Sequence, residues 1–256
     1  MNTTGNTILI TGGGSGIGRG LAEAFHNLGN KVIIAGRRKQ LLDETVAANP
    51  GMASATLNIE NAASIRAFAE KLTADFPALN VVIHNAGIMR PENLAQSSET
   101  ADAEAMIATN LLGPIRLTAA LFPHLQKQPH ATIMTVSSGL AFIPMAITPT
   151  YNATKAAIHS WTQSLRYQLK STNIEVIELV PPYVQTELVG SQQAADPRAM
   201  PLKDYLAETI EIIKTQPNAT EVLVERVKPL RFSASSGEEK YNAFYKQFND
   251  AMMAPH

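Results

Sequence analysis

Short apolar runs rich in β-branched residues alternate along the chain with longer segments in which apolar side chains recur every third or fourth position. The first pattern is typical of buried strands and the second of amphipathic helices. The apolar runs predict strands over residues 7–11, 31–36, 54–59, 80–84, 132–138, 174–180 and 221–224. The periodic segments predict a helix that stops at Gly29 and further helices over 41–48, 62–76, 101–125, 150–170, 203–214 and 238–252.

Two segments interrupt this regular alternation. Gly113-Pro114 falls inside the helix predicted over 101–125, and because proline breaks helical hydrogen bonding we expect a bend near Asn110. Residues 185–201 are polar and contain glycine and proline, which predicts a loop. Since binding residues are often carried by loops, we expect a substrate lid over 185–205.

The alternation of strands and helices predicts one parallel sheet covered by helices on both faces. Right-handed crossovers and a glycine-rich first turn favour a single-domain α/β fold over residues 1–256, doubly wound and Rossmann-like, with strand order 3-2-1-4-5-6-7. Ligands of such sheets bind beyond the carboxyl ends of the strands. Those ends carry Gly12, Gly36, Asn85, Ser138 and Pro181, so we expect one site there.

Composition narrows the class of protein. The 256 residues carry a formal charge of -1 with spread basic residues, which argues against a nucleic-acid-binding surface. The six histidines show no metal-binding spacing and there is no cysteine, so we expect no metal site. We see no apolar run long enough to span a membrane and no room for a signal peptide before the strand at Thr7, and expect a cytoplasmic protein.

Glycines fill the turn between the first strand and the first helix, in Thr11-Gly12-Gly13-Gly14-Ser15-Gly16-Ile17-Gly18. Glycines there allow a tight turn and a close approach of the backbone to a ligand, and the helix start offers free N–H groups to a phosphate. A flexible loop looks similar in sequence. The position between a strand and a helix favours a dinucleotide site.

The end of the second strand bears on which dinucleotide is bound. An acidic residue there would accept hydrogen bonds from the adenosine ribose, whereas this chain has Gly36 followed by Arg37 and Arg38. A guanidinium suits a ribose 2′-phosphate, to which the Ser15 hydroxyl would add a hydrogen bond. This pattern favours NADP(H) over NAD(H). The alternative is a pair of solvated arginines that open the next helix.

Tyr151 and Lys155 stand four residues apart on a predicted helix and therefore on one face. An ammonium beside a phenol favours the phenolate and should lower the tyrosine pKa, which suits proton exchange with a carbonyl or alcohol. Ser138 ends a strand upstream and could hold the same oxygen. Such pairs also occur by chance on solvated helices.

These motifs together resemble one family. The glycine turn and Asn85-Ala86-Gly87 resemble the cofactor motifs of short-chain dehydrogenases/reductases, and the chain resembles this family over nearly its whole length. Asn110, Ser138, Tyr151 and Lys155 match the family's catalytic set in order and spacing. Pro181-Pro182-Tyr183-Val184-Gln185-Thr186 resembles its Pro-Gly-x-Val-x-Thr segment. His84 and Pro182 stand where the family usually has Asn and Gly, and Asn58 where it often has Asp.

The resemblance implies hydride transfer between NADP(H) and a small carbonyl or alcohol substrate. It implies that Tyr151 is the acid/base, that Ser138 holds the substrate oxygen, that Lys155 tunes Tyr151, and that Asn110 positions a water. The implied cofactor-binding residues are Gly12, Ser15, Gly16, Ile17, Gly18, Arg37, Arg38, Asn58, Ile59, Asn85, Ala86, Gly87, Tyr151, Lys155, Pro181, Val184 and Thr186. A homodimer is implied as well.

More narrowly, the segment from Ser138-Gly139-Leu140-Ala141-Phe142 to Val224-Glu225-Arg226-Val227 resembles the oxidoreductases found beside D-alanyl-lipoteichoic-acid genes. Two other classes of function stay open. A dinucleotide-binding scaffold or sensor needs no acid, so the four catalytic matches weigh against it. A purely structural dimerisation module leaves both the glycine turn and those four residues unexplained.

Overall fold

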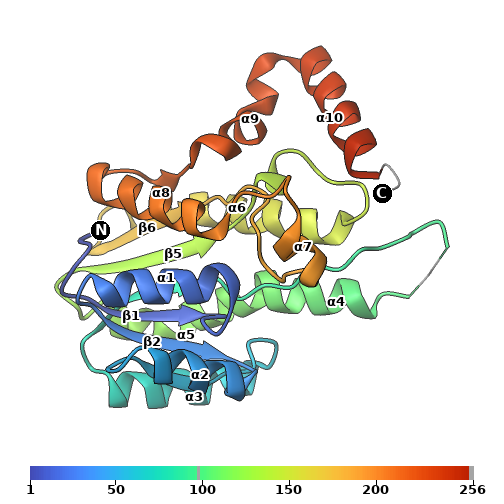
Figure 1. Cartoon of the computed structure of the whole chain (residues 1–256). Helices are drawn as coiled ribbons and strands as arrows, with labels where there is room; N and C mark the ends of the chain where they lie inside the picture. Colours follow the sequence, from blue (N-terminus) through green and yellow to red (C-terminus); the bar gives the residue numbers. More distant parts are fainter. Residues whose placement is uncertain (97–98, 254–256) are drawn as a thin grey trace.

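The β-branched runs form one parallel sheet in the computed structural model, which describes residues 1–96 and 99–253. The strands are β1 (Thr7–Thr11), β2 (Lys31–Gly36), β3 (Ala53–Thr56), β4 (Leu79–His84), β5 (Ala131–Val136), β6 (Ile174–Leu179) and β7 (Glu221–Val222). Among the described residues their order is β3-β2-β1-β4-β5-β6-β7, and each neighbouring pair is parallel (Figure 1). The predicted fold class and strand order are confirmed.

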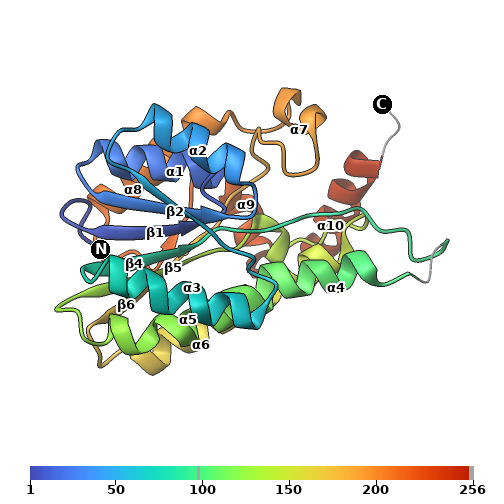
Figure 2. The same cartoon turned by 90° about the horizontal axis from the view of Figure 1, so that it is seen from below.

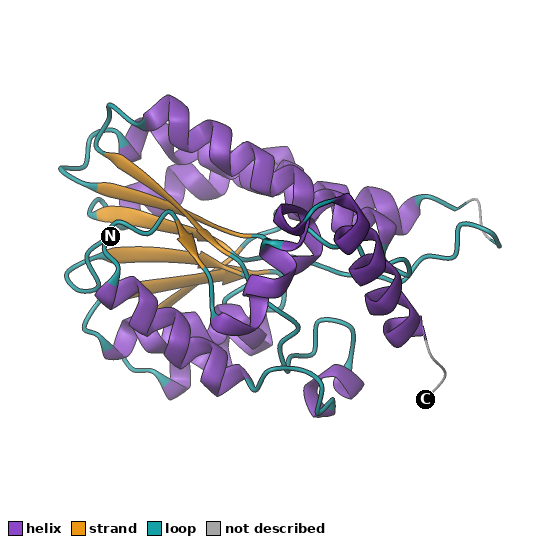
Figure 3. Ribbon diagram, turned by 90° about the horizontal axis from the view of Figure 1, so that it is seen from above, coloured by secondary structure: helices purple, strands orange, loops and turns teal. Residues whose placement is uncertain are grey.

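Helices cover both faces of the sheet, as Figure 3 shows from above. The longer ones are α1 (Gly16–Asn27), α2 (Lys39–Ala48), α3 (Ala62–Asp75), α5 (Gly113–Leu125), α6 (Pro149–Leu169) and α8 (Leu202–Thr215). On one face α3, α5 and α6 bury residues such as Phe68 and Leu121. On the other face α1, α2 and α8 bury residues such as Phe25 and Ile213. Both apolar cores stop at the strand ends, which leaves that edge for a site.

Four strands end earlier than their apolar runs predict. β3 ends at Thr56, yet Leu57 and Ile59 stay buried in the segment that follows. β7 ends at Val222, because Val224 leaves the sheet and packs in a separate cluster with Tyr205. β5 and β6 end at Val136 and Leu179. Apolar residues beyond a strand end read as strand in the sequence, although here they line the edge of the sheet.

The helical run over 101–125 consists of α4 (Ala101–Ile107), a π-helical turn η1 (Ala108–Leu112), and α5, which continue one another in Figure 2. We predicted a bend near Asn110, and the structure has a π-helical turn at that position. Pro114 lies in the first turn of α5, where proline is tolerated. By length and composition this run could cross a membrane, so our expectation that none is long enough was wrong. Leu117 and Leu121 are buried in the core, as in soluble core helices.

Residues 225–253 form an arm beyond the sheet, which we call the C-terminal arm. It comprises η3 (Glu225–Val227), α9 (Lys228–Arg231), η4 (Ser233–Ser236) and α10 (Glu238–Met253). In Figure 1 the arm rises in red above α6 and its end returns toward the middle of the molecule. Only α10 was predicted, since the shorter helices are interrupted by polar and breaker residues. The predicted loop over 185–201 likewise contains a short helix, α7 (Ser191–Ala195).

Candidate active site

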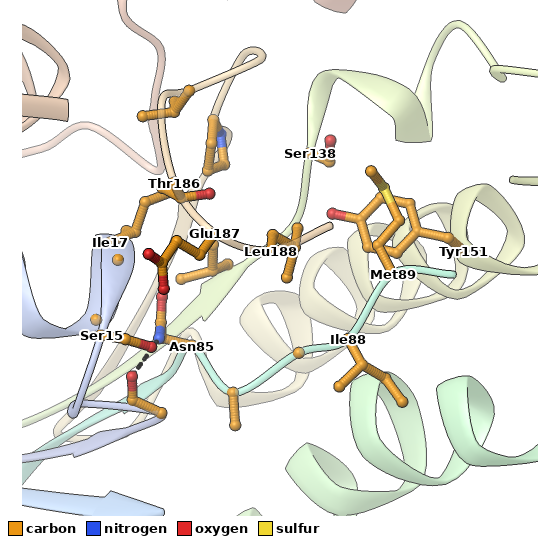
Figure 4. Close-up of a pocket in the computed structure, with 18 of the residues that line it drawn as sticks. Ser15, Ile17, Asn85, Ile88, Met89, Ser138, Tyr151, Thr186, Glu187 and Leu188 are labelled. Carbon is orange, nitrogen blue, oxygen red and sulfur yellow. Dashed lines mark hydrogen bonds between the residues drawn. The ribbon is translucent and has the colours of Figure 1, made fainter. Parts of the chain in front are cut away.

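A cavity of about 560 Å³ opens along the carboxyl ends of the strands. Every residue that the sequence predicted for catalysis or cofactor binding lines it, except Asn58 and Asn110. The cavity has two ends, and Figure 4 draws both, with Ser15 and Asn85 on one side and Ser138 and Tyr151 on the other. We call the first the glycine half and the second the tyrosine half.

The glycine half is built from backbone that only glycine allows. Gly16 has a φ of 53°, in the left-handed region, and a Cβ placed on Gly18 would lie 2.3 Å from Asn85 Nδ2 and from the Gly12 carbonyl oxygen. The Thr11 hydroxyl accepts hydrogen bonds from the Asn85 and Ala86 N–H groups, both at 3.1 Å. The glycine turn is thereby fixed to the segment after β4, which makes one rigid wall.

The two arginines after β2 have different partners. Arg38 Nη2 donates to Ser15 Oγ at 2.8 Å, whereas Arg37 Nη1 forms an ion pair with Glu60 Oε1 at 2.6 Å. The sequence predicted that Ser15 and the arginines meet at a 2′-phosphate, and the structure brings Ser15 together with Arg38. Both arginines line the cavity, and Glu60 is also held by the Thr109 hydroxyl at 2.9 Å. Arg38 is therefore the cation next to the glycine turn.

Asn58 does not line the cavity, so the structure does not bring it together with the other residues predicted to bind the cofactor. Its side-chain oxygen accepts a hydrogen bond from the Glu60 N–H at 3.1 Å, so it closes a local turn. Leu57 and Ile59, on either side of it, are buried and reach the cavity instead. Alternating residues of an extended segment point in opposite directions. The side chains of Leu57 and Ile59 therefore face the cavity, and the Asn58 side chain faces away from it.

Tyr151 lies in the first turn of α6 with its side chain almost completely buried. Burial raises the pKa of Tyr151 to about 12, and a side-chain hydrogen bond with Ser138 acts more weakly in the opposite direction. We expected Lys155 to lower this pKa, and in the folded chain burial outweighs any such effect. The phenol is therefore protonated near neutral pH.

Lys155 is also buried, one helical turn beyond Tyr151. Its Nζ lies 5.5 Å from the centre of the Tyr151 ring and donates to the Val136 carbonyl oxygen at 2.8 Å. Burial lowers the pKa of Lys155 to about 8, and the carboxylate of Glu178 opposes this shift. The ammonium is held between the end of β5 and the phenol, where its charge can act on both.

Asn110 lies behind the cavity wall and does not line it. Its Oδ1 accepts from the Ile88 N–H at 2.9 Å, and its Nδ2 donates to the Ile88 carbonyl at 2.9 Å and to Thr154 Oγ1 at 3.1 Å. The side-chain amide therefore clasps the segment after β4 to α6. A role for Asn110 in positioning a water stays a prediction.

The segment after β6 closes the glycine half from above. A Cβ placed on Gly16 would lie 3.5 Å from the Thr186 side chain, so Thr186 sits directly over the glycine turn. Gln193 of α7 is buried and donates to the Val184 carbonyl at 2.8 Å and to Thr186 Oγ1 at 3.1 Å. Pro182, in place of the expected glycine, does not disturb this arrangement.

The tyrosine half contains an apolar wall that sequence reasoning missed. Its residues share large aliphatic, thioether or aromatic side chains and come from separate segments, namely Met89, Leu140, Met145, Leu188, Leu230, Phe248 and Met252. A Cβ on Gly139 would lie 2.9 Å from Leu230, which places the C-terminal arm beside Ser138. No motif marks these positions, and the signal that could have found them is the apolar face of the last helix, which has no strand to cover.

The match to known sequences fits this geometry. Residues 6–197 match the family model described as short chain dehydrogenase. The chain is 37% identical over 253 residues to the uncharacterized oxidoreductase DltE of Bacillus subtilis (strain 168), which covers 97% of this chain and 98% of that one. The chain belongs to the short-chain dehydrogenase family. Within the family it is DltE-like, as the resemblance in the sequence indicated.

Solved structures of short-chain dehydrogenases share the fold. One from Burkholderia cenocepacia J2315, in complex with NADP, is 22% identical with a TM-score of 0.80 and covers 100% of both chains. Another from Burkholderia phymatum, in complex with NAD, is 22% identical with a TM-score of 0.79 and covers 92% of this chain and 95% of that one. At these identities the likeness concerns the fold alone.

A cluster of titratable side chains lies behind Lys155. The ligand atoms of His159, Glu178 and Glu221 lie within 4.8 Å of one another. His159 Nδ1 is 2.8 Å from a Glu178 oxygen, and Arg231 donates to both Glu221 oxygens at 2.7 and 2.9 Å. Each of the two carboxylates thus has an imidazole or guanidinium partner within hydrogen-bond distance.

Proposed function

We propose that this short-chain dehydrogenase is an NADP(H)-dependent oxidoreductase that transfers a hydride between the nicotinamide and a carbonyl or alcohol substrate. The observation that carries the proposal is the shared cavity: the glycine half and the Ser138–Tyr151 pair line one continuous space. A purely dinucleotide-binding protein needs only the first of these. A buried, protonated phenol beside a second hydroxyl is the arrangement that carbonyl reduction requires.

The residues that would hold the cofactor are those of the glycine half, together with Pro181, Val184 and Thr186 of the segment above it. When bound, the nicotinamide supplies or accepts the hydride. Ser138 orients the substrate oxygen and stabilises the charge that develops on it. Tyr151 donates its proton to that oxygen during reduction and accepts one during oxidation. Lys155 stabilises the phenolate that remains, because its ammonium lies close to the ring.

NADP(H) is favoured by the charges at the end of β2. Arg38 and Ser15 already form a hydrogen-bonded pair beside the glycine turn, and Arg37 lines the same part of the cavity. Gly36 offers no carboxylate to the ribose hydroxyls of NAD(H). The solved relatives bind NAD or NADP, which supports a nicotinamide dinucleotide as the cofactor class.

We also propose a cytoplasmic homodimer. Ile107 and Leu112, on the outer side of the helical run over 101–125, and Tyr167 of α6 are apolar or aromatic side chains exposed by 36% or more. A second copy of this face would cover them. Sedimentation of the purified protein tests this, and a monomer at micromolar concentration contradicts it.

The test of the activity combines two measurements on the purified protein. Dissociation constants for NADPH and NADH establish binding and preference, and consumption of NADPH with a broad panel of ketones, aldehydes and quinones establishes turnover. We expect tighter binding of NADPH and turnover of at least one carbonyl class. Tight NADPH binding without any turnover would contradict the enzymatic proposal and favour the sensor, while equal binding of both dinucleotides would contradict the cofactor assignment.

A further inference from the structure

The tyrosine half of the cavity is apolar nearly everywhere except at the reacting groups. Around Ser138 and Tyr151 the wall contains thioether and aliphatic side chains, and Figure 4 shows Met89 next to Tyr151, with Leu188 between Tyr151 and Glu187. Glu187 itself lies on the side of Ser15 and Asn85. A ligand in the tyrosine half therefore contacts the hydroxyls of Ser138 and Tyr151 and a largely apolar surface.

Three polar side chains that line other parts of the cavity already have partners within the protein. The Tyr183 hydroxyl donates to Asp196 Oδ2 at 3.2 Å, and the Gln193 amide donates to backbone and hydroxyl partners in the segment above the glycine turn. Arg226 Nη2 donates to the Arg198 carbonyl at 2.5 Å. A substrate with several polar groups would have to break these bonds, whereas an apolar body leaves them intact.

The outer wall of the tyrosine half comes from α10 of the C-terminal arm. Asn249 is buried, and its Oδ1 accepts from the Ala146 N–H at 2.6 Å while its Nδ2 donates to the Pro144 carbonyl at 3.1 Å. These two contacts flank Met145, which lines the cavity. The two hydrogen bonds of the Asn249 side chain thus fix α10 over the segment between β5 and α6.

Phe248 and Met252 stand one helical turn apart beside Asn249, and both line the cavity. The Tyr241 hydroxyl adds a hydrogen bond to the Phe142 carbonyl at 3.3 Å, farther along the same segment. The two side chains therefore line the same cavity as Met145, on the helix that Asn249 fixes to the neighbouring segment. The match to the family model ends at residue 197, so α10 lies outside the matched part of the chain.

We propose that the substrate is a carbonyl compound, or the corresponding alcohol, with a single polar reacting group and an extended apolar chain, and that Phe248 and Met252 are its specificity-determining residues. The inference rests on the proposed function for the position of the reacting oxygen at Ser138 and Tyr151. Thioether side chains adapt to different shapes, so Met89, Met145 and Met252 admit a range of apolar chains of similar length.

The test uses linear methyl ketones that differ only in the length of the alkyl chain, with NADPH as the reductant. We expect kcat/KM to rise with each added methylene until the pocket is full, by up to about fourfold per group, because burying a methylene contributes about 0.8 kcal/mol and 1.4 kcal/mol is tenfold. Phe248→Ala and Met252→Ala should flatten this dependence for the longer ketones and leave the shortest ones nearly unchanged.

Tyr245→Ala is the matched control, since Tyr245 is an aromatic residue of the same helix that is 37% exposed and does not line the cavity. It should keep the wild-type dependence on chain length. A wild-type rate that is independent of chain length, or a dependence that survives in both Phe248→Ala and Met252→Ala, overturns the inference.

A binding measurement separates this inference from the proposed reaction. The matching secondary alcohols are titrated into the protein saturated with NADP, and their dissociation constants are compared across chain lengths. Affinity that rises with length without any turnover keeps the apolar pocket and contradicts the proposed hydride transfer. Affinity that does not change with length overturns the pocket, whether or not turnover is found.

Discussion

The two halves of the cavity are built in different ways. The glycine half is made mainly of backbone at the ends of adjacent parallel strands, and its parts are joined by short hydrogen bonds such as those from the Asn85 and Ala86 N–H groups to Thr11. The tyrosine half is made of side chains from widely separated segments, including the C-terminal arm. The first half is therefore fixed by the sheet, and the second depends on how loops and α10 pack.

This difference separates what the fold supplies from what the individual protein adds. A strand end with a glycine turn can serve any dinucleotide enzyme of this architecture, because the phosphate is recognised by backbone N–H groups. The apolar wall of the tyrosine half is held in place by the hydrogen bonds of Asn249, and its residues can be changed one at a time without disturbing the sheet. Chemistry and cofactor should therefore respond to changes in one half, and substrate choice to changes in the other.

The largest effect should come from the phenol where the two halves meet. Tyr151→Phe keeps the ring and removes the proton, so we expect turnover to fall by roughly 10²–10⁴-fold, the usual contribution of acid–base catalysis. NADPH affinity should stay nearly unchanged. The measurements are steady-state kinetics on any reduced carbonyl and a cofactor titration.

Tyr183→Phe is the control for this variant, because it removes a second phenol from the same cavity. That hydroxyl is bound to Asp196, and its removal should spare the chemical step. If Tyr151→Phe kept substantial reductase activity, or if both variants lost activity equally, Tyr151 would lose its role as the acid.

The next effect is on stability, at the strand that carries the glycine half. His84 at the end of β4 is buried, and burial lowers its pKa to about 3. The unfolded chain takes up a proton near pH 6.5, whereas the folded chain does not until about pH 3. Stability should therefore fall as the pH drops below about 6.5, by up to about 1.4 kcal/mol per pH unit.

Urea unfolding at pH 7 and near pH 4.5 measures this loss, and His84→Asn should make it smaller by about 2–3 kcal/mol. His130→Gln is the matched control, since it removes an imidazole that is 48% exposed and so separates burial at His84 from the loss of any histidine. Equal acid sensitivity in wild type and His84→Asn would show that other groups cause it.

Sequence reasoning reached the glycine half because its determinants are local. The turn from Gly12 to Gly18 and the Asn85 motif are short segments, and their position directly after a strand indicates a ligand-binding role. It did not distinguish Asn58 from its neighbours Leu57 and Ile59, which are the buried residues that line the cavity. It also failed on the balance of forces at Tyr151, because the depth of burial that raises the pKa is a property of the folded chain.

The apolar residues of the tyrosine half could not be predicted from the sequence, for a different reason. Phe248 and Leu230 look like ordinary apolar positions in the sequence, and they become cavity residues only because the C-terminal arm folds back over the segment after β5. Asn249 carries the contact, yet an asparagine in a polar helix gives no sign of a partner some hundred residues earlier, at Ala146. Contacts of this range are set by packing, which a single sequence does not specify.

Cofactor preference should respond to the charges of the glycine half alone. Charge-assisted hydrogen bonds contribute roughly 1.5–3 kcal/mol each, so NADPH should bind at least about tenfold more tightly than NADH. Arg38→Leu should remove most of this preference, because Arg38 is the cation bonded to Ser15. Arg37→Leu should have a smaller effect, since Arg37 is already paired with Glu60. Titration of both dinucleotides measures each change.

Reversal of the preference is the stricter test of the same half. Gly36→Asp combined with Arg37→Ile places a carboxylate where it repels a 2′-phosphate and accepts from free ribose hydroxyls, so NADH should become the tighter ligand. The dependence of kcat/KM on ketone length should not change in this double variant. Wild-type protein that binds NADH as tightly as NADPH contradicts the assignment, whatever the variant does.

The smallest effect concerns residues 185–201, which cover the boundary between the two halves. In the structure Gln193 ties α7 to Val184 and Thr186, and most residues from 187 to 192 are exposed. Such segments open at low free energy and close over ligands. We expect fast hydrogen exchange of these amides in the free protein, slower exchange with NADP and substrate bound, and faster exchange in the free Gln193→Ala variant.

The amides of β5, buried in the sheet, serve as the internal reference and should not respond. Equal protection with and without ligands would mean that this segment is a fixed wall, and both halves of the site would then be preformed.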